Sequence, residues 1–144
     1  MATVNEDGSP HNTPLFFIYN DDFTKIYWGS HPNSQHSRNI ERTRLAYIVV
    51  FDSKVWGQGG LYITLKNAHC VSDDDLSETL RVHNDTRKRW GKQPLEISYY
   101  QQDEGQRMYS ADISKIESYE VTRNDEGRVV EEIRKPIEAK DLGF

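Results

Sequence analysis

The sequence contains a single cysteine, Cys70, and has no cluster of positive charge. One cysteine excludes a disulfide framework within the chain and is typical of the reducing cytoplasm, where we expect the protein to work. The net charge of −5 and the lack of a basic stretch argue against nucleic-acid binding, which needs clustered Lys and Arg. No apolar run approaches the ~20 residues of a membrane span, and the first residues do not resemble a signal peptide.

Several motifs that carry chemistry are also missing. There is no Cys-x-x-Cys pair and no His-x-x-x-His on a helix, so we expect no dedicated metal site. There is no Gly-x-Ser-x-Gly elbow and no phosphate-binding loop ending in Gly-Lys-Ser/Thr. The glycine-rich run at 57–60 precedes a strand rather than a helix, which argues against a Rossmann site. No side chain stands out as a general base, and we assign no catalytic residue.

The 144 residues predict one domain that spans 1–144. Only 35% of the residues are hydrophobic, so the chain would gain from burying more surface in a dimer. Short apolar runs and turn residues predict about six or seven antiparallel strands and two helices. The expected strands lie at 2–4, 13–19, 25–30, 45–51, 61–71, 107–119 and 121–133, the first three as a meander, and the expected helices run from 34 to about 42 and from 73 to about 90. The run at 13–19 is apolar on both faces, which favours a closed barrel packed against another element.

The stretch from Ser30 to Ile40 is the most informative for chemistry. A strand is expected to end at Ser30, and Asn33 or Ser34 can cap the following helix. Hydroxyls and free amides at a helix start bind anions, and the basic side chain of His36 lies in the first turn. An ordinary capped helix on a polar surface, with His36 as a surface residue, explains the same residues and remains the alternative.

Two further segments suit a planar ligand. The polar residues 11–14 precede a strand and offer atoms to the edge of a ring, and Gly29 permits close approach of a ring to the backbone. For Phe16, Phe17 and Trp28 the plain alternative is barrel core, which we expect for at least two of the three. Trp56, in the glycine-rich loop, is either an interface residue or a neighbour of the ring.

Together these segments resemble the FMN-binding split barrels related to pyridoxamine 5′-phosphate oxidase. The resemblance covers nearly the whole chain, and the order and spacing of the motifs carry more weight than any single one. The matching motifs are Ala2-Thr3-Val4, Asp7-Gly8, Pro10-His11, Thr13-Pro14, Tyr27-Trp28-Gly29-Ser30, Ser34-Gln35-His36-Ser37-Arg38-Asn39-Ile40, Phe51-Asp52, Leu61-Tyr62-Ile63 and Arg107-Met108-Tyr109.

The resemblance implies a mainly β fold, a six-stranded antiparallel Greek-key split barrel with two peripheral helices. It also implies a homodimer with two FMN sites at its interface. By position, Asn12, Thr13 and Pro14 would border the flavin ring, and Gly29 and Ser30 would lie beside the ring or the ribityl chain. Ser34, Gln35 and His36 would hold the phosphate. Relatives that oxidise pyridoxamine phosphate usually place Lys or Arg where Gln35 and His36 stand.

Two departures bear on function. Residues 134–142 contain no Arg-x-His pair for a substrate phosphate, so we do not expect a genuine pyridoxamine phosphate oxidase. The family's helix before the first strand is also missing, which points to a misassigned start or a truncation. The resemblance therefore indicates an FMN-dependent oxidoreductase of unknown substrate. The alternative is a non-catalytic flavin- or haem-binding dimer with a storage, sensing or stress role.

Overall fold

The computed structural model describes residues 1–54 and 60–142, and within them eight strands form one antiparallel sheet. The strands are β1 (Ala2–Val4), β2 (Pro10–Asn12), β3 (Ile18–Tyr19), β4 (Lys25–Ser30), β5 (Ala46–Val50), β6 (Leu61–Cys70), β7 (Arg107–Arg123) and β8 (Val129–Pro136). Their order is β2-β1-β5-β6-β7-β4-β3, and β8 pairs with β7. The predicted class, a mainly β antiparallel fold of the split-barrel type, is confirmed, although the strand count exceeds the expected six.

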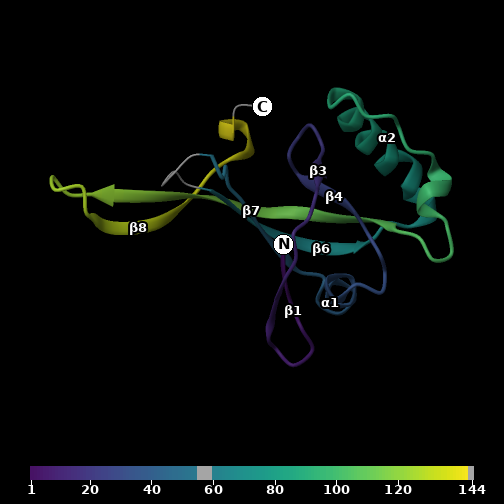
Figure 1. The fold of residues 1–144 in the computed structure, drawn as a ribbon, viewed down its shortest axis with the longest axis horizontal. Coiled ribbons are helices and arrows are strands. Elements are labelled where there is room, and N and C mark those ends of the chain that lie inside the picture. Colours follow the sequence, from purple (N-terminus) through teal and green to yellow (C-terminus); the bar gives the residue numbers. More distant parts are fainter. Residues whose placement is uncertain (55–59, 143–144) are drawn as a thin grey trace.

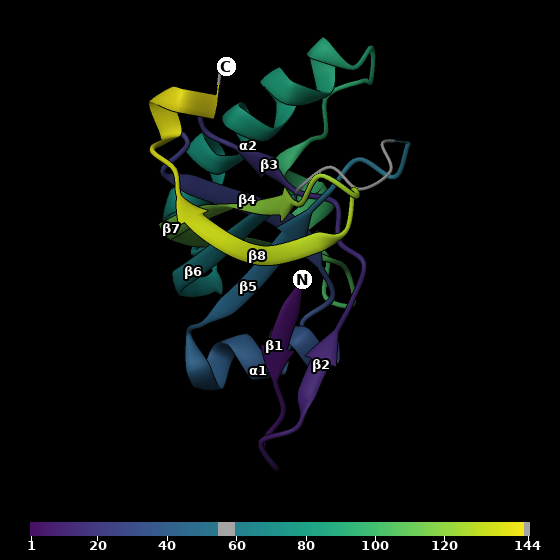
Figure 2. The ribbon, with the colours of Figure 1, turned by 90° about the vertical axis from the view of Figure 1, so that its left-hand side faces the viewer.

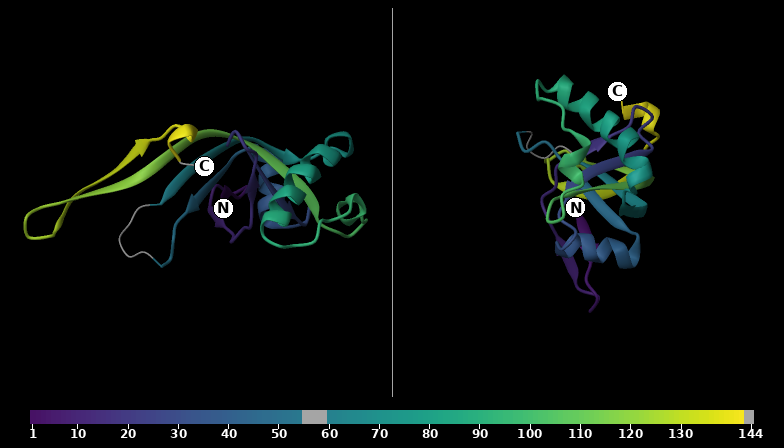
Figure 3. Two further views of the ribbon diagram at one scale, coloured as in Figure 1. Left: turned by 90° about the horizontal axis from the view of Figure 1, so that it is seen from above. Right: turned by 90° about the vertical axis from the view of Figure 1, so that its right-hand side faces the viewer.

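Two α-helices accompany the sheet in the described residues, α1 (Gln35–Thr43) and α2 (Asp73–Arg89). Short 3-10 helices, η1 (Ile97–Tyr100) and η2 (Ala139–Leu142), follow later in the chain. The two α-helices lie at different ends of the sheet, and the β7–β8 hairpin extends away from the rest of the molecule as an arm (Figure 1). Figure 2 shows the β1–β2 hairpin beside α1, and Figure 3 shows the curvature of the long strands.

Both helix starts follow from their sequences. Ser34 caps α1, and its hydroxyl accepts a hydrogen bond from the Ser37 amide. Ser72 caps α2 in the same way through the Asp75 amide, and its hydroxyl donates to the Asp75 carboxylate at 2.8 Å. Three acidic residues in the first turn of α2 and three basic residues in its last turn complement the helix dipole. Both predicted helices are therefore confirmed, close to the expected bounds.

Side chains alternate along β4 and belong to two different hydrophobic clusters. Ile26 and Trp28 point into the larger cluster, together with Ile40 of α1 and the inward residues of β5 and β6. Tyr27 points the other way, into a smaller cluster with Leu76 and Leu80 of α2. Successive residues of a strand face opposite sides of a sheet, so β4 separates the layer beneath α2 from the main core.

The long strand β6 contains a β-bulge. Its register with β7 shifts between Lys66 and His69, where Asn67 has a left-handed backbone with φ of 52°. Ala68 then points into the core with no exposed surface, and His69 faces the opposite side. The bulge therefore turns the imidazole of His69 toward the layer that contains α2.

The expectation of a strand at 13–19 is wrong for most of that segment, because only β3 is extended and paired. Pro14 has no amide hydrogen to donate to a sheet, and Phe16 is 67% exposed, with its ring edge-on to Trp90 at 5.0 Å. Phe17 is half-buried and Trp28 is buried, so two of the three aromatic residues do belong to the core.

Two expectations about strand connections are also corrected. The first three predicted segments do not form a meander, because β3 pairs with β4 as expected but β1 pairs with β2 and β5 instead of β3. The last hairpin begins with one long strand, β7, which continues through Glu120 to Arg123. The sequence instead predicts that a strand ends at Tyr119 and that a second one begins at Val121. The turn between β7 and β8 contains Gly127 at φ of 77°, a left-handed conformation that glycine adopts without strain.

Candidate functional site

The start of α1 gathers three serine hydroxyls around one imidazole. Ser30 Oγ, at the end of β4, lies 2.5 Å from His36 Nε2, and Ser34 Oγ lies 3.2 Å from the same nitrogen. Ser34 Oγ is also 3.2 Å from Ser30 Oγ and 2.9 Å from Ser37 Oγ. We call Ser30, Ser34, His36 and Ser37 the hydroxyl cluster. It brings together Ser34 and His36, which are predicted to hold the phosphate, and Ser30, which is predicted to lie beside the ring or the ribityl chain.

This donor set fits a phosphate monoester. The first turn of α1 contains no acidic residue, and the amides at a helix start favour negative charge. Ser30 and Ser37 are buried, so their hydroxyls are held in place by packing as well as by each other. Tyr109 also shares a hydrogen bond with Ser37, which fixes that hydroxyl from the side of β7.

Burial lowers the pKa of His36, and the neighbouring imidazole of His11 lowers it further. The two rings are stacked, with centroids 6.5 Å apart and planes 13° apart. Without an anion, His36 is therefore neutral at physiological pH. A bound phosphate would act in the opposite direction, because an adjacent negative charge favours the imidazolium form.

The side chain of Gln35 makes hydrogen bonds to other residues of α1. Its amide nitrogen donates to Asn39 Oδ1 at 3.0 Å, and its oxygen accepts from Arg38 at 2.6 Å. Arg38 also donates to the Asn33 carbonyl, so a permanently charged guanidinium lies against the first turn of α1. The basic residue of this turn is thus held close to the site, although its side chain is exposed.

Asn12, Thr13 and Pro14 lie where β2 ends. Asn12 is exposed and pairs with Ala2 of β1, while the half-buried Thr13 donates its amide to the Met1 carbonyl at 3.0 Å. Pro14 is exposed. His11, the residue before them, stacks on His36, so the structure places this segment close to the hydroxyl cluster.

Gly29 lies apart from the cluster. A Cβ on Gly29 would meet Gln106 Oε1 at 3.1 Å and Tyr100 Cε1 at 3.3 Å, on the side of the sheet that carries α2. The hydroxyl of its neighbour Ser30 points to the side of α1 instead. Trp56, the remaining predicted site residue, lies outside the described residues.

Asn39 and Ser37 contribute to the site, although neither is predicted from the sequence to be functional. Asn39 is buried and donates to Thr3 Oγ1 and Asn5 Oδ1, both at 3.0 Å, which fastens α1 to the β1–β2 hairpin. Ser37 completes the cluster because it lies one helical turn from Ser34. A polar residue three positions after a cap could have revealed Ser37, whereas no sequence signal marks the long-range contacts of Asn39.

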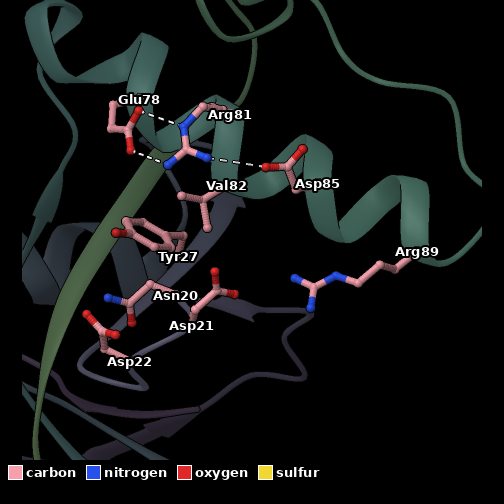
Figure 4. Close-up of a pocket in the computed structure, with 9 residues that line it drawn as sticks. All are labelled: Asn20, Asp21, Asp22, Tyr27, Glu78, Arg81, Val82, Asp85 and Arg89. Atoms are coloured by element: carbon pink, nitrogen blue, oxygen red, sulfur yellow. Dashed lines mark hydrogen bonds and ion pairs between the residues drawn. The ribbon is translucent and has the colours of Figure 1, made fainter. Parts of the chain in front are cut away.

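Two cavities lie away from the cluster. One of about 300 Å³ lies between α2 and the β3–β4 turn and is lined mainly by charged residues (Figure 4). The other, of about 310 Å³, is an apolar groove beside β1 and β5 that Val4, Leu45 and Tyr47 help to line. Among the described residues, no group of three or more potential ligands could hold a metal ion, and no helix is long and apolar enough to cross a membrane.

These features define a mainly β protein of the split-barrel type with a hydroxyl-rich helix start. The sequence pattern of the pyridoxamine 5′-phosphate oxidase family matches residues 1–120, so the chain belongs to this family. A comparison with curated proteins found no match.

Solved structures share the fold. A protein related to general stress protein 26 from Clostridium acetobutylicum has a TM-score of 0.61 at 14% identity, covering 94% of this chain and 82% of that one. HutZ, the haem storage protein from Vibrio cholerae, has a TM-score of 0.60 at 19% identity, covering 80% of each chain. A pyridoxamine 5′-phosphate oxidase-related, FMN-binding protein from Nostoc punctiforme has a TM-score of 0.56 at 14% identity, covering 94% and 84%.

Proposed function

We propose that this protein binds FMN, with the phosphate at the start of α1. The hydroxyl cluster carries the proposal, because three hydroxyls, an imidazole and free helix amides converge where no acidic residue opposes an anion. Ser34, Gln35 and His36 would hold the phosphate, Gln35 through its backbone amide because its side chain is engaged by Asn39 and Arg38.

The flavin ring would lie toward the end of β2. Asn12, Thr13 and Pro14 would border it, since His11 places their segment beside His36. Ser30 would contact the ribityl chain, and Gly29 would contribute through its backbone, because the space above its α-carbon is occupied by Tyr100 and Gln106. Trp56 would be either a neighbour of the ring or an interface residue.

A homodimer would complete the site. Val4, Leu45, Val49 and Phe51 are large apolar side chains with exposed surface, and the apolar groove beside β1 and β5 adjoins the first two. An exposed apolar face of this kind is stabilised by association. Light scattering at micromolar concentration should give twice the 16.8 kDa mass of the chain, and a monomer would contradict the proposal.

The function that fits best is an FMN-dependent oxidoreductase of unknown substrate, acting as one domain in the cytoplasm. The bound flavin would supply hydride or electron transfer, and the chain would position it and limit access of water. The absence of an Arg-x-His pair in residues 134–142 argues against pyridoxamine phosphate as substrate. Rapid turnover of pyridoxamine phosphate by the FMN-loaded protein would contradict this part of the proposal.

The decisive experiment is a titration of the purified protein with FMN, in which binding is measured by the quenching of flavin fluorescence. Wild type should bind saturably, Ser30→Ala should bind more weakly, and Ser77→Ala, on the exposed face of α2, should match wild type. Reduction of the complex by NADH or NADPH would then test for catalysis. Equal affinities for wild type and Ser30→Ala would place the phosphate elsewhere.

A second candidate is haem binding without catalysis. The haem storage protein HutZ shares the fold, and the stacked imidazoles of His11 and His36 could provide an axial ligand. Titration with haemin would test this. A Soret shift that is lost in His36→Ala, together with absence of FMN binding, would favour haem over flavin.

A further inference from the structure

The β7–β8 arm projects from the domain and carries apolar side chains that the rest of the described chain does not cover (Figure 1). Beyond Tyr119 its two strands pair only with each other, and every residue of β8 except Ile133 is exposed. Val129 is 45% exposed and Val130 is 60% exposed, both close to the turn. A two-stranded hairpin is only marginally stable by itself, so contact with another surface would stabilise the arm.

The base of the arm is fastened to the sheet. Arg134 of β8 donates to Tyr47 Oη at 2.9 Å, and its guanidinium carbon lies 4.1 Å from the centroid of the Tyr62 ring. Tyr119, directly opposite Arg134 in the register, has its ring centroid 6.3 Å from that of Tyr62. These contacts tie the arm to β5 and β6, so it leaves the sheet in a defined direction.

The arm continues the sheet face that carries the exposed apolar residues of β5. Tyr47 and Val49 alternate with the buried Ile48, so they lie on the face away from the core. Tyr62 pairs with Val49 and therefore shares that face. One face thus runs from the apolar groove beside β1 and β5, past the tyrosine rings, to the arm.

The tip of the arm is apolar and acidic. Four carboxylates flank its two valines, those of Asp125, Glu126, Glu131 and Glu132. The one cation in this stretch, Arg128, is paired with Glu126 at 3.3 Å. The tip therefore presents apolar side chains within a net negative charge.

The groove has the opposite charge around an apolar lining. Each charged residue directly next in the sequence to a lining residue is basic, namely Arg42, Arg44 and Lys66. None of the three forms an ion pair within residues 1–54 and 60–142. Arg42 donates to the Val4 carbonyl, which holds its guanidinium at the rim of the groove. Groove and tip therefore complement each other in both charge and apolar surface.

The spacing of arm and groove suits a symmetric dimer. Val129 pairs with Arg123, which lies six residues along β7 from Glu117, the partner of Tyr62, so Val129 is about 20 Å beyond Tyr62. Lys66, at the rim of the groove, lies about 13 Å from Tyr62 in the opposite direction along β6. A twofold axis lies midway between an arm and the groove that its symmetry mate enters. This axis falls within about one residue of Tyr62, on the exposed face.

We propose that in the homodimer the arm of each copy docks in the apolar groove beside β1 and β5 of the other copy. Val129 and Val130 of one chain would pack against Val4 and Leu45 of its partner. The inference rests on the proposed homodimer and specifies which surfaces close it. A second copy is the occupant because arm and groove lie on one face of the same chain and complement each other, as a twofold interface requires.

The first test is light scattering of the whole protein over a dilution series. The double variant Val129→Thr/Val130→Thr keeps both side chains β-branched but replaces buried methyl groups by hydroxyls, so the dissociation constant of the dimer should rise at least about tenfold. Glu131→Lys should raise it at least about threefold, and Lys66→Glu in the same chain should recover part of that loss. Glu104→Lys makes the same charge change in an exposed loop and should match wild type.

The second test is disulfide cross-linking in a Cys70→Ser background. A chain with Leu45→Cys and a chain with Val130→Cys should form a mixed covalent dimer when they are oxidised together. Ser77→Cys, exposed on α2, should not replace Val130→Cys. If a chain with both Leu45→Cys and Val130→Cys closes the disulfide within itself, the arm reaches its own groove and the proposal is overturned.

The outcomes separate this inference from the homodimer itself. A monomeric wild type would remove both. A stable dimer whose affinity is unchanged by Val129→Thr/Val130→Thr, and in which the mixed cysteine chains do not cross-link, would leave the homodimer in place and overturn docking of the arm.

Discussion

Replacement of His36 should change the pH dependence of FMN affinity. In the free protein, burial and His11 hold the pKa of His36 below the ordinary value of about 6.5. A phosphate within the hydroxyl cluster would raise that pKa, because it lies beside the imidazole. The complex would then bind one more proton than the free protein between the two pKa values. Affinity should therefore rise as pH falls through the bound-state pKa and level off below the free-state pKa.

The size of the effect follows from the geometry. Ser30 and Ser34 place oxygen atoms 2.5 and 3.2 Å from His36 Nε2, so a phosphate oxygen in the cluster would make a charge-assisted hydrogen bond to that nitrogen. Such a bond contributes roughly 1–2 kcal/mol at a partly buried site, after desolvation of the imidazolium. The dissociation constant of FMN should then rise about five- to thirty-fold across the titration.

The assay is a fluorescence titration of FMN from about pH 5.5 to about pH 8.5. His36→Ala should bind more weakly with a reduced slope, and His36→Lys should bind with a flattened slope. His31→Gln, an exposed histidine in the same loop, should keep the wild-type slope. The second ionisation of the phosphate, near pH 6, contributes to every curve, so the difference between slopes isolates His36. Equal slopes in wild type and His36→Ala would refute the reasoning.

Three stability changes can be tested by urea unfolding. Ser34→Ala removes the cap of α1 and should cost ~1 kcal/mol, with Ser98→Ala as an exposed control. Asn39→Ala breaks the buried hydrogen bonds to the β1–β2 hairpin and should cost about 2–3 kcal/mol; a loss below ~0.5 kcal/mol would contradict that role. Burial lowers the pKa of His83, and the positive charge of Arg87 lowers it further. The free energy of unfolding should therefore decrease as pH falls below ~6.5, because the unfolded chain takes up the proton first, and His83→Leu should reduce that decrease. An unchanged acid response in His83→Leu would count against it.

The elements that the sequence predicted well are those with local signals. Ser34 and Ser72 mark the helix starts as cap residues, and the predicted strand at 25–30 has the same bounds as β4. The prediction of a strand at 13–19 is wrong because the apolar side chains of this segment make tertiary contacts and are not the inward face of a strand. Phe16 packs on Trp90 of a distant loop, and no pattern within seven residues distinguishes that contact from a buried strand.

The hydroxyl cluster of the candidate site was predictable for the same reason. Ser30, Ser34 and His36 lie within seven residues, so a strand end followed by a cap brings them together without help from the rest of the chain. The contributions of His11 and Tyr109 depend on how β2 and β7 are placed, which the local sequence does not specify. The stacking of His11 on His36 could be recognised only from the fold.

The two faces of β4 explain why Gly29 and Ser30, neighbours in the motif, do not share a pocket through their side chains. Ser30 points toward α1 with Trp28, whereas Gly29 shares the face of Tyr27 beneath α2. A ligand at α1 can therefore use the Ser30 hydroxyl and the backbone of Gly29, but not the surface that Tyr27 lines. The same alternation places Tyr27 on the other face, where it lines a cavity beneath α2 together with Ser110, its partner in β7.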